Sequence, residues 1–166
     1  QSKYPDVKFI FIDGAPAETP ESAPEIKDNT VSIVYAEEQA GYLAGYAAVK
    51  EGNTKLGFMG GMAVPAVVRY GYGFVKGAND AAAEDNKNVS IKYNYTGYFK
   101  ASPDIKAKAA GWYADGTEVI FSCGGAIFDS ISSAAEESNG KVIGVDVDQS
   151  SQSKTCLLYT SPSPRD

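Results

Sequence analysis

Five residues of this sequence have side chains or backbones suited to holding a small ligand, and each lies just after an apolar run. They are Asp13, Phe99, Gly124, Gly125 and Asp146. Carboxylates accept pairs of hydrogen bonds from neighbouring hydroxyl groups, and glycines let the backbone approach a ligand closely. An aromatic face can cover a sugar or a base. The set therefore suits a small ligand rich in hydroxyl groups.

Alternating strands and helices are needed to bring these residues together. The apolar patterns predict strands at residues 7–12, 30–35, 55–59, 89–95, 119–122 and 142–145, and helices at residues 37–50, 67–85, 102–114 and 128–138. Strands that are separated by single helices pair in parallel with right-handed crossovers, which gives a doubly wound α/β fold. In such sheets ligands bind outside the carboxyl ends of the strands, where all five residues fall.

Two of these segments carry more specific expectations. Residues 7–12 ("VKFIFI") form a continuous apolar run, which predicts a strand buried on both faces, and a surface loop rich in Pro and acids follows it. In the helix at residues 37–50, Tyr42, Leu43 and Tyr46 recur at helical spacing, so we expect them to face the core rather than to form a binding stripe.

Composition and charge exclude several classes of protein. With 15 basic and 21 acidic residues the net charge is −6, and an acidic surface repels a phosphate backbone, so nucleic acid is not expected as a partner. The 166 residues include no His, which removes the commonest general base and metal ligand. Cys123 and Cys156 form no zinc-type spacing. No apolar run reaches the roughly 18 residues expected of a membrane span.

Two catalytic interpretations fail on the motifs themselves. The turn "GFMGGM" is rich in glycine, but it lacks the G-x-G-x-x-G spacing and the Lys-Ser/Thr continuation of phosphate-binding loops. A Ser, Cys or Asp nucleophile needs a neighbouring base, and no such pair can be assembled without His. We therefore expect neither an enzyme nor a cofactor.

Seven segments carry a resemblance to a known family. They are "FIDG", "YAEEQAGYLAGYAAV", "KLGFMGGMAVP", "GFVKGAND", "YNYTGYF", "VIFSCGG" and "VIGVDVDQ", and they follow the order and spacing of the basic membrane protein family. That family includes purine nucleoside receptor lipoproteins, which are substrate-binding proteins of ABC importers. The resemblance implies a type I periplasmic-binding-protein fold, in which two doubly wound lobes close on a ligand.

The resemblance also implies how the chain is divided. Residues 1–35 would belong to the first lobe, and residues 36–154 would contain the crossing segment and most of the second lobe. The chain would then be a piece of a longer protein. Residues 155–166 resemble one reading frame of a transposon-end adaptor used in DNA sequencing libraries, so we expect them, Cys156 included, not to be native.

Roles in ligand binding follow from the same resemblance. Asp13 and Asp146 would bind ligand hydroxyls, Asp146 at the position of the family's ribose-binding carboxylate; a turn and a helix cap are the respective structural alternatives. Gly124 and Gly125 would bring the backbone to the ligand unless the turn is glycine for steric reasons alone. Phe99 would stack on the ligand or simply pack under the lobe edge. The further candidates are Met62 and Arg69, whereas Asp148 is expected to be a capping or surface charge and Cys123 a space-filling residue.

The function expected from this resemblance is capture of a nucleoside, a purine nucleoside in particular, for delivery to ABC permease subunits. The protein would be extracytoplasmic and attached to the cell membrane by a lipid anchor outside this chain. A ligand-sensing regulator on the same fold is the alternative, as is the same receptor class with a sugar or riboflavin as its ligand.

Overall fold

The computed structural model describes residues 1–19, 22–153 and 157–160 of the chain. Its strands are β1 (Phe9–Ile12), β2 (Thr30–Ile33), β3 (Lys55–Gly60), β4 (Ser90–Tyr95), β5 (Val119–Cys123), β6 (Lys141–Gly144) and β7 (Leu157–Thr160). Its helices are α1 (Glu37–Lys50), α2 (Pro65–Glu84), α3 (Pro103–Ala114) and α4 (Ile127–Ser138). Every strand and helix predicted from the sequence is present, with ends that differ by a few residues.

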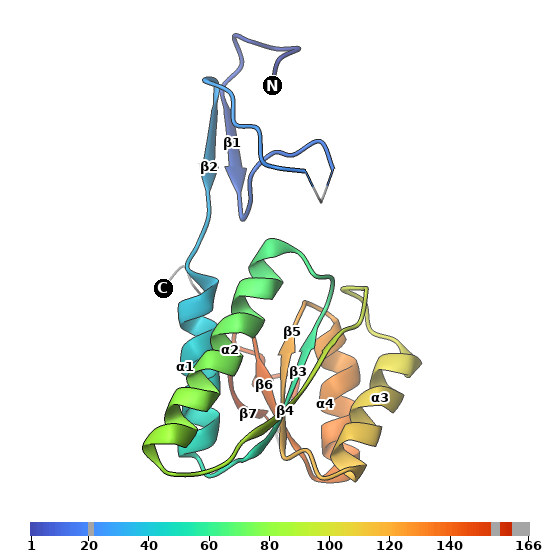
Figure 1. Cartoon of the computed structure of the whole chain (residues 1–166). Coiled ribbons are helices and arrows are strands. Elements are labelled where there is room, and N and C mark those ends of the chain that lie inside the picture. The colour runs from blue at the N-terminus through green and yellow to red at the C-terminus, as the bar shows by residue number, and fades with distance from the viewer. Residues whose placement is uncertain (20–21, 154–156, 161–166) are drawn as a thin grey trace.

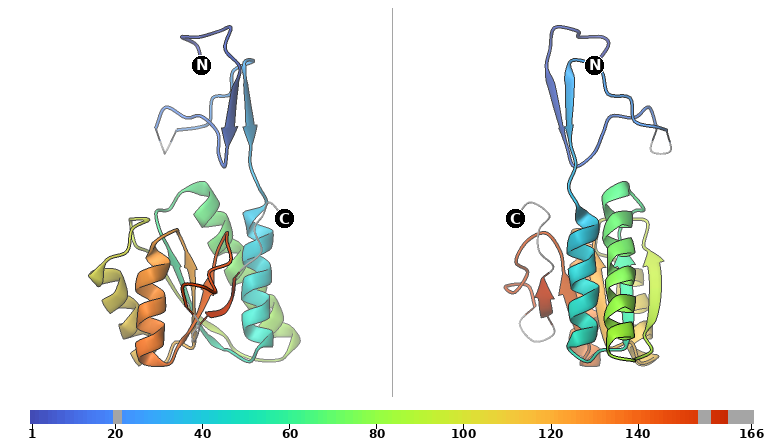
Figure 2. Two further views of the ribbon diagram at one scale, coloured as in Figure 1. Left: turned by 180° about the vertical axis from the view of Figure 1, so that it is seen from behind. Right: turned by 60° about the vertical axis from the view of Figure 1, so that its left-hand side comes forward.

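The strands form two separate parallel sheets. β1 pairs with β2 alone, and the second sheet has the order β4-β3-β5-β6-β7. Helices α1 and α2 cover one face of the larger sheet and α3 and α4 the other, whereas β1 and β2 extend away from this body (Figure 1). Figure 2 shows the same three layers from behind and from the side. The predicted doubly wound α/β arrangement is confirmed.

The central strands are apolar throughout because both of their faces are covered. Leu56 and Phe58 of β3 pack against α1 and α2, whereas Met59 points to the opposite face, against α3 and α4. β5 divides in the same way, with Phe121 on the first face and Ile120 on the second. Successive side chains of a strand alternate between faces, so a strand between two helical layers must be apolar at every position.

Local signals in the sequence set the start of α3. Ser102 is the N-cap, and its side-chain oxygen accepts a hydrogen bond from the backbone N–H of Ile105 at 3.2 Å. Pro103 follows at the first helical position, where its fixed φ suits the helix and its missing N–H costs nothing. The helix therefore begins where the Ser-Pro-Asp triplet predicts.

The expectation that the apolar residues of α1 at helical spacing face the core holds for Val49, which is buried, and in part for Tyr46, which packs against the core, but it is wrong for Leu43. Leu43 is exposed and Tyr42 and Tyr46 are only partly buried, whereas the small residues of the helix are buried. The reason is close contact with α2. A Cβ atom on Gly45 would lie 2.0 Å from the carbonyl oxygen of Phe74, so the two helix backbones touch at this glycine. Only small residues fit on the contact face, and the tyrosines are displaced to its edge.

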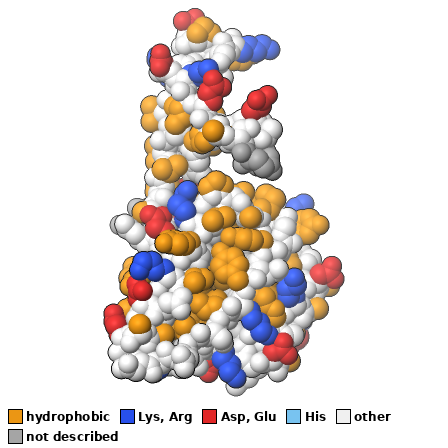
Figure 3. Space-filling model, in the orientation of Figure 1, with side chains coloured by type: hydrophobic (Ala, Val, Ile, Leu, Met, Phe, Trp, Pro, Cys, Tyr) orange, Lys and Arg blue, Asp and Glu red, His pale blue; other side chains and the backbone are white. Residues whose placement is uncertain are grey.

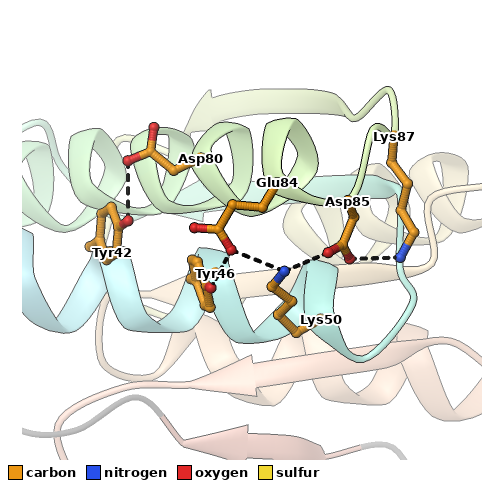
Figure 4. A network of polar contacts seen from close by, with 7 residues as sticks. All are labelled: Tyr42, Tyr46, Lys50, Asp80, Glu84, Asp85 and Lys87. Atoms are coloured by element: carbon orange, nitrogen blue, oxygen red, sulfur yellow. Dashed lines mark hydrogen bonds and ion pairs between the residues drawn. The ribbon is translucent and has the colours of Figure 1, made fainter.

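The displaced tyrosines belong to a polar network along the edge of α1 and α2 (Figure 4). The hydroxyl of Tyr46 donates to Glu84 at 2.6 Å, and Lys50 bridges Glu84 at 3.1 Å and Asp85 at 2.5 Å. The pKa of the Glu84 carboxyl lies below its ordinary value because of the hydrogen bonds from Tyr46 and Lys50. The network is solvent-exposed, so we expect it to add little to the free energy of unfolding.

The prediction that residues 7–12 form a strand buried on both faces is also wrong for this chain. Ile10 is 71% exposed, and Phe11 and Ile12 are exposed as well. The strand forms, but its only partner is β2, and in the part of the chain that the structure describes no helix layer covers either face. The space-filling view shows the resulting apolar side chains along the projecting pair and a further group over the body (Figure 3).

One strand was not predicted. β7 runs parallel to β6 with an irregular register, Val142 opposite Leu157 and Ile143 opposite Tyr159. The outer edge of β6 otherwise offers unpaired backbone groups, which readily recruit another segment. The proposed adaptor origin of residues 155–166 stays a prediction, as do the lobe boundaries, and residues 154–156 and 161–166 lie outside the described part. No helix of the described residues has the length and apolar character to cross a membrane.

Candidate ligand-binding site

A cavity of about 330 Å³ lies at the carboxyl ends of β3, β5 and β6, below the end of β1. Its lining consists of Asp13, Glu37, Val64, Ala66, Val67, Tyr70, Phe99, Cys123, Gly124, Gly125 and Asp146. The five leading candidates from the sequence all belong to this lining. Its volume is at the lower end of the ~300–1,000 Å³ that is usual for small-molecule sites.

Asp146 projects from a tight turn directly after β6. The N–H of Val147 donates to the carbonyl of Val145 at 2.8 Å, so Asp146 is the central residue of a three-residue turn, with φ of 67°. A γ-turn with positive φ is rare and strained for a non-glycine residue. Residues held in such conformations concentrate at functional sites, where the surrounding structure fixes them. The turn directs the carboxylate into the cavity.

Tyr70, on the first half of α2, holds that carboxylate in place. Its hydroxyl donates to Oδ1 of Asp146 at 3.2 Å. Burial and the charge of Asp146 raise the pKa of Tyr70 far above its ordinary value of 10.0, so the phenol stays a donor. Tyr70 was not singled out from the sequence. A Tyr on an apolar helix face needs a partner for its hydroxyl, and that was the available signal.

Asp13 reaches the cavity from the other sheet. It follows β1, its N–H donates to the carbonyl of Ile33 at 3.0 Å, and its φ of 64° turns the chain away from the strand. Asp is one of the few residues that adopt this left-handed conformation at low cost. Both candidate carboxylates thus sit at sharp turns just beyond the ends of strands, and both line one cavity.

Phe99 and the glycine pair form the remaining predicted wall. The Phe99 carbonyl accepts from the N–H of Ala126 at 3.2 Å, which ties its loop to the start of α4. Gly124 and Gly125 carry the chain from β5 into that helix, and Gly125 has the left-handed φ of 56°. The neighbouring Tyr98 is 66% exposed and does not line the cavity, so of these two adjacent aromatic residues Phe99 faces the cavity.

Glu37 is a cavity residue that sequence reasoning missed. Its side chain is only 3% exposed and accepts a hydrogen bond from Nε of Arg69 at 2.6 Å. Glu37 stands three and seven residues before Ala40 and Ala44 on the buried face of α1, a spacing that could have identified it. Arg69 therefore acts on the cavity through Glu37, since it does not belong to the lining. Met62 is 43% exposed and lies outside the lining too.

Cys123 behaves as a space-filling residue and Asp148 as a capping residue. Cys123 is buried in the cavity wall, and burial, followed by the charges of Asp146 and Glu37, raises the pKa of its thiol well above the ordinary value. A thiol in that state is unreactive. Asp148 accepts a hydrogen bond from the N–H of Ser150 at 2.9 Å and is absent from the lining. Within the described ranges no three His, Cys, Asp or Glu side chains gather to hold a metal ion.

One protein family matches nearly the whole chain in sequence. Residues 1–161 match the Bmp family, described as ABC transporter substrate-binding protein PnrA-like. The ABC transporter nucleoside-binding protein BmpA of Lactococcus lactis is 31% identical over 156 residues, covering 87% of this chain and 40% of that protein. Basic membrane protein A2 of Borrelia garinii is 34% identical over 151 residues, covering 88% and 42%. The chain thus spans about 40% of the length of these relatives.

Solved structures agree with the fold. A solute-binding protein of an ABC transporter system from Aeropyrum pernix superposes with a TM-score of 0.81 at 22% identity, over 96% of this chain and 45% of that one. A LacI family transcriptional regulator from Enterococcus faecium with bound ribose gives 0.58 at 15% identity, over 92% and 55%. At these identities the likeness shows the type I periplasmic-binding-protein fold alone. The family match decides the rest: this chain belongs to the Bmp family of PnrA-like ABC transporter substrate-binding proteins.

Proposed function

We propose that this chain is part of a receptor that binds a nucleoside, a purine nucleoside in particular, between two lobes and delivers it to the membrane permease of an ABC importer. The observation that carries the proposal is the cavity, which collects the carboxylates of Asp13 and Asp146, an aromatic ring and a glycine turn from four separate segments, beside the ion-paired Glu37. The name of the Lactococcus lactis relative, a nucleoside-binding protein, supports the choice of ligand.

The chemistry of the lining suits the two halves of a nucleoside. The carboxylates of Asp146 and Asp13 can each accept hydrogen bonds from neighbouring ribose hydroxyls. The ring of Phe99 offers a flat apolar surface for the base, and stacking of this kind is worth about 1–3 kcal/mol. Gly124 and Gly125 have no side chains to keep the ligand from the backbone of the β5 turn.

The mechanism requires no bond to be made or broken. Asp13 stands on the segment before α1 and Asp146 on the larger body, so a ligand that contacts both favours the conformation in which they are close. Binding would thus stabilise hinge closure, and the closed form is what a permease would recognise. We propose accordingly that the protein catalyses no reaction and that it acts outside the cytoplasm, held at the membrane by a lipid anchor.

Met62 and Arg69 stay predictions in this scheme. Arg69 has a defined contact, the ion pair with Glu37 at 2.6 Å, so its contribution would be to fix the cavity wall. Met62 lies on the exposed exit turn of β3 and would reach a ligand only after closure.

The test is a thermal-shift screen of the protein that is expressed from the gene for this chain, after the gene has been extended to the length of its relatives. Adenosine, guanosine and inosine are compared with free bases, ribose and riboflavin. At a ligand concentration of ~100 times Kd, binding stabilises the folded state by about 2.7 kcal/mol, which is a measurable rise in Tm. We expect the nucleosides to give the largest rise.

Two single variants make the screen specific. Asp146→Ala should abolish the rise in Tm, whereas Asp148→Ala should keep it, because Asp148 is two residues away but contacts Ser150 and lies outside the cavity. A shift with ribose or riboflavin alone would keep the receptor and replace the ligand. A shift that survives Asp146→Ala would refute the proposed site.

A further inference from the structure

Gly61, on the exit turn of β3, lies outside the cavity lining but under the Phe99 ring. A Cβ atom at Gly61 would stand 2.3 Å from Cδ1 and 2.4 Å from Cε1 of that ring. A Cβ on Gly124 would stand 3.2 Å from the same Cδ1. The ring thus rests against two glycine backbones. At Gly61, in the β3 turn, the distances are shorter than any side chain allows, and at Gly124, in the β5 turn, a side chain would make a tight contact.

Backbone hydrogen bonds fix the loop that carries the ring. The N–H of Thr96 donates to the carbonyl of Gly60 at 2.8 Å, and the N–H of Gly97 donates to the carbonyl of Gly61 at 3.1 Å. At the other end the Phe99 carbonyl accepts from the N–H of Ala126 at 3.2 Å. With the loop held at both ends, the height of the ring above the sheet depends on what lies beneath it.

From this geometry we propose that Gly61 is a positioning residue for base recognition: by lacking a side chain it seats the Phe99 ring at the depth that leaves room for a planar base. The proposal rests on the proposed nucleoside function. The φ of Gly61 lies outside the left-handed region, so alanine fits its backbone conformation. The methyl group of Gly61→Ala would stand 2.9 Å from the carbonyl oxygen of Tyr98 but closer still to the ring, so it must act mainly by pushing the ring into the cavity.

A double-mutant cycle in the full-length protein tests the proposal, with adenosine as the probe and titration calorimetry as the measurement. We expect Gly61→Ala to weaken adenosine binding roughly tenfold, as the loss of one stacking contact would. In a Phe99→Ala background the same substitution should change the affinity less than twofold, because the group through which it acts is gone. Equal effects in the two backgrounds would overturn the proposal.

Stability is controlled in two ways. Gly111→Ala adds the same methyl group on an exposed face of α3, where nothing lies within 4 Å, and it should leave adenosine binding unchanged. If Gly61→Ala alone folds poorly, the double variant with Phe99→Ala should recover most of the Tm of Phe99→Ala, since the two shortest contacts are with the ring and only the Tyr98 carbonyl oxygen, at 2.9 Å, remains. A Tm that does not recover would show that the methyl group disturbs the backbone, and it would contradict the proposed positioning of the Phe99 ring by Gly61.

A crystal structure of Gly61→Ala separates this inference from the proposed function. We expect the Phe99 ring to move into the cavity. A ring left in place would refute the proposed role of Gly61 in positioning it, whichever ligand the protein binds. If the wild-type protein binds no nucleoside while the ring does move in Gly61→Ala, the nucleoside assignment fails and the role of Gly61 in seating the ring stands.

Discussion

At the scale of single residues, the candidate site depends on side chains that are fixed before any ligand arrives. Asp146 is set by its turn, with φ of 67°, and by the hydroxyl of Tyr70 at 3.2 Å. Glu37 is set by Arg69. A preorganised carboxylate loses less conformational entropy on binding than a mobile one, so the partners of the carboxylates should affect affinity by fixing them in place.

We predict that Tyr70→Phe lowers nucleoside affinity roughly three- to tenfold, because a hydrogen bond of this kind is worth about 0.5–1.5 kcal/mol. The ring itself should stay in place, since its edge-to-face contact with Phe121, at 6.0 Å between centroids, does not need the hydroxyl. Titration calorimetry measures the affinity. Tyr72→Phe, an exposed position on the same helix, is the matched control, and an equal loss there would argue against positioning of Asp146.

At the scale of elements, α1 and α2 illustrate how backbone contact outweighs surface charge. The helices touch through glycines, and the exposed network of Lys50, Glu84 and Asp85 lies beside that contact. A fully packed interior has no room for an added methyl group, whereas exposed ion pairs contribute little to the free energy of unfolding.

Gly45→Ala is therefore predicted to lower the free energy of unfolding by about 1–3 kcal/mol, the usual cost of overpacking. The new methyl group would lie 2.0 Å from the Phe74 carbonyl oxygen, so the two helices must separate. Chemical denaturation measures the change. Gly111→Ala should instead be neutral or stabilising by up to ~1 kcal/mol through helix propensity, so a loss of similar size in both variants would disprove the packing argument.

At the scale of the whole molecule, the larger sheet is covered on both faces, whereas within the described residues no helix covers either face of the β1–β2 pair. Two-stranded sheets have little stability of their own in water. The molecule therefore combines a body with its own core and a projecting pair whose apolar side chains, Ile10 among them, are in contact with solvent.

Hydrogen exchange on the 166-residue chain should reveal that difference. We predict that the backbone amides of β1 and β2 exchange at least ~100-fold faster than those of β5, because opening of the pair exposes little additional apolar surface. Mass spectrometry of peptides that cover residues 9–12 and 119–123 measures both rates. Equal protection would mean that the pair is stabilised by contacts beyond those that the structure describes.

Much of the fold could be predicted because the decisive signals are local. The continuous apolar runs of β3 and β5, the Ser102 cap of α3 and the glycine turns after the strands each act over a few residues. The common carboxyl edge of parallel strands then follows from topology, and with it the grouping of Phe99, Gly124 and Asp146 around one cavity.

What the sequence could not decide depends on contacts between distant segments. The burial of Glu37 and the exposure of Leu43 follow from which face of α1 meets α2. Three contacts of the site join residues that are tens of positions apart in the sequence: Tyr70 with Asp146, Arg69 with Glu37, and the Phe99 ring with Gly61. The sequence predicts every strand and helix except β7, together with the side chains available for binding, because propensity and periodicity are local. Which side chains are fixed, buried or exposed follows from the tertiary structure, because those properties depend on contacts between pairs of elements.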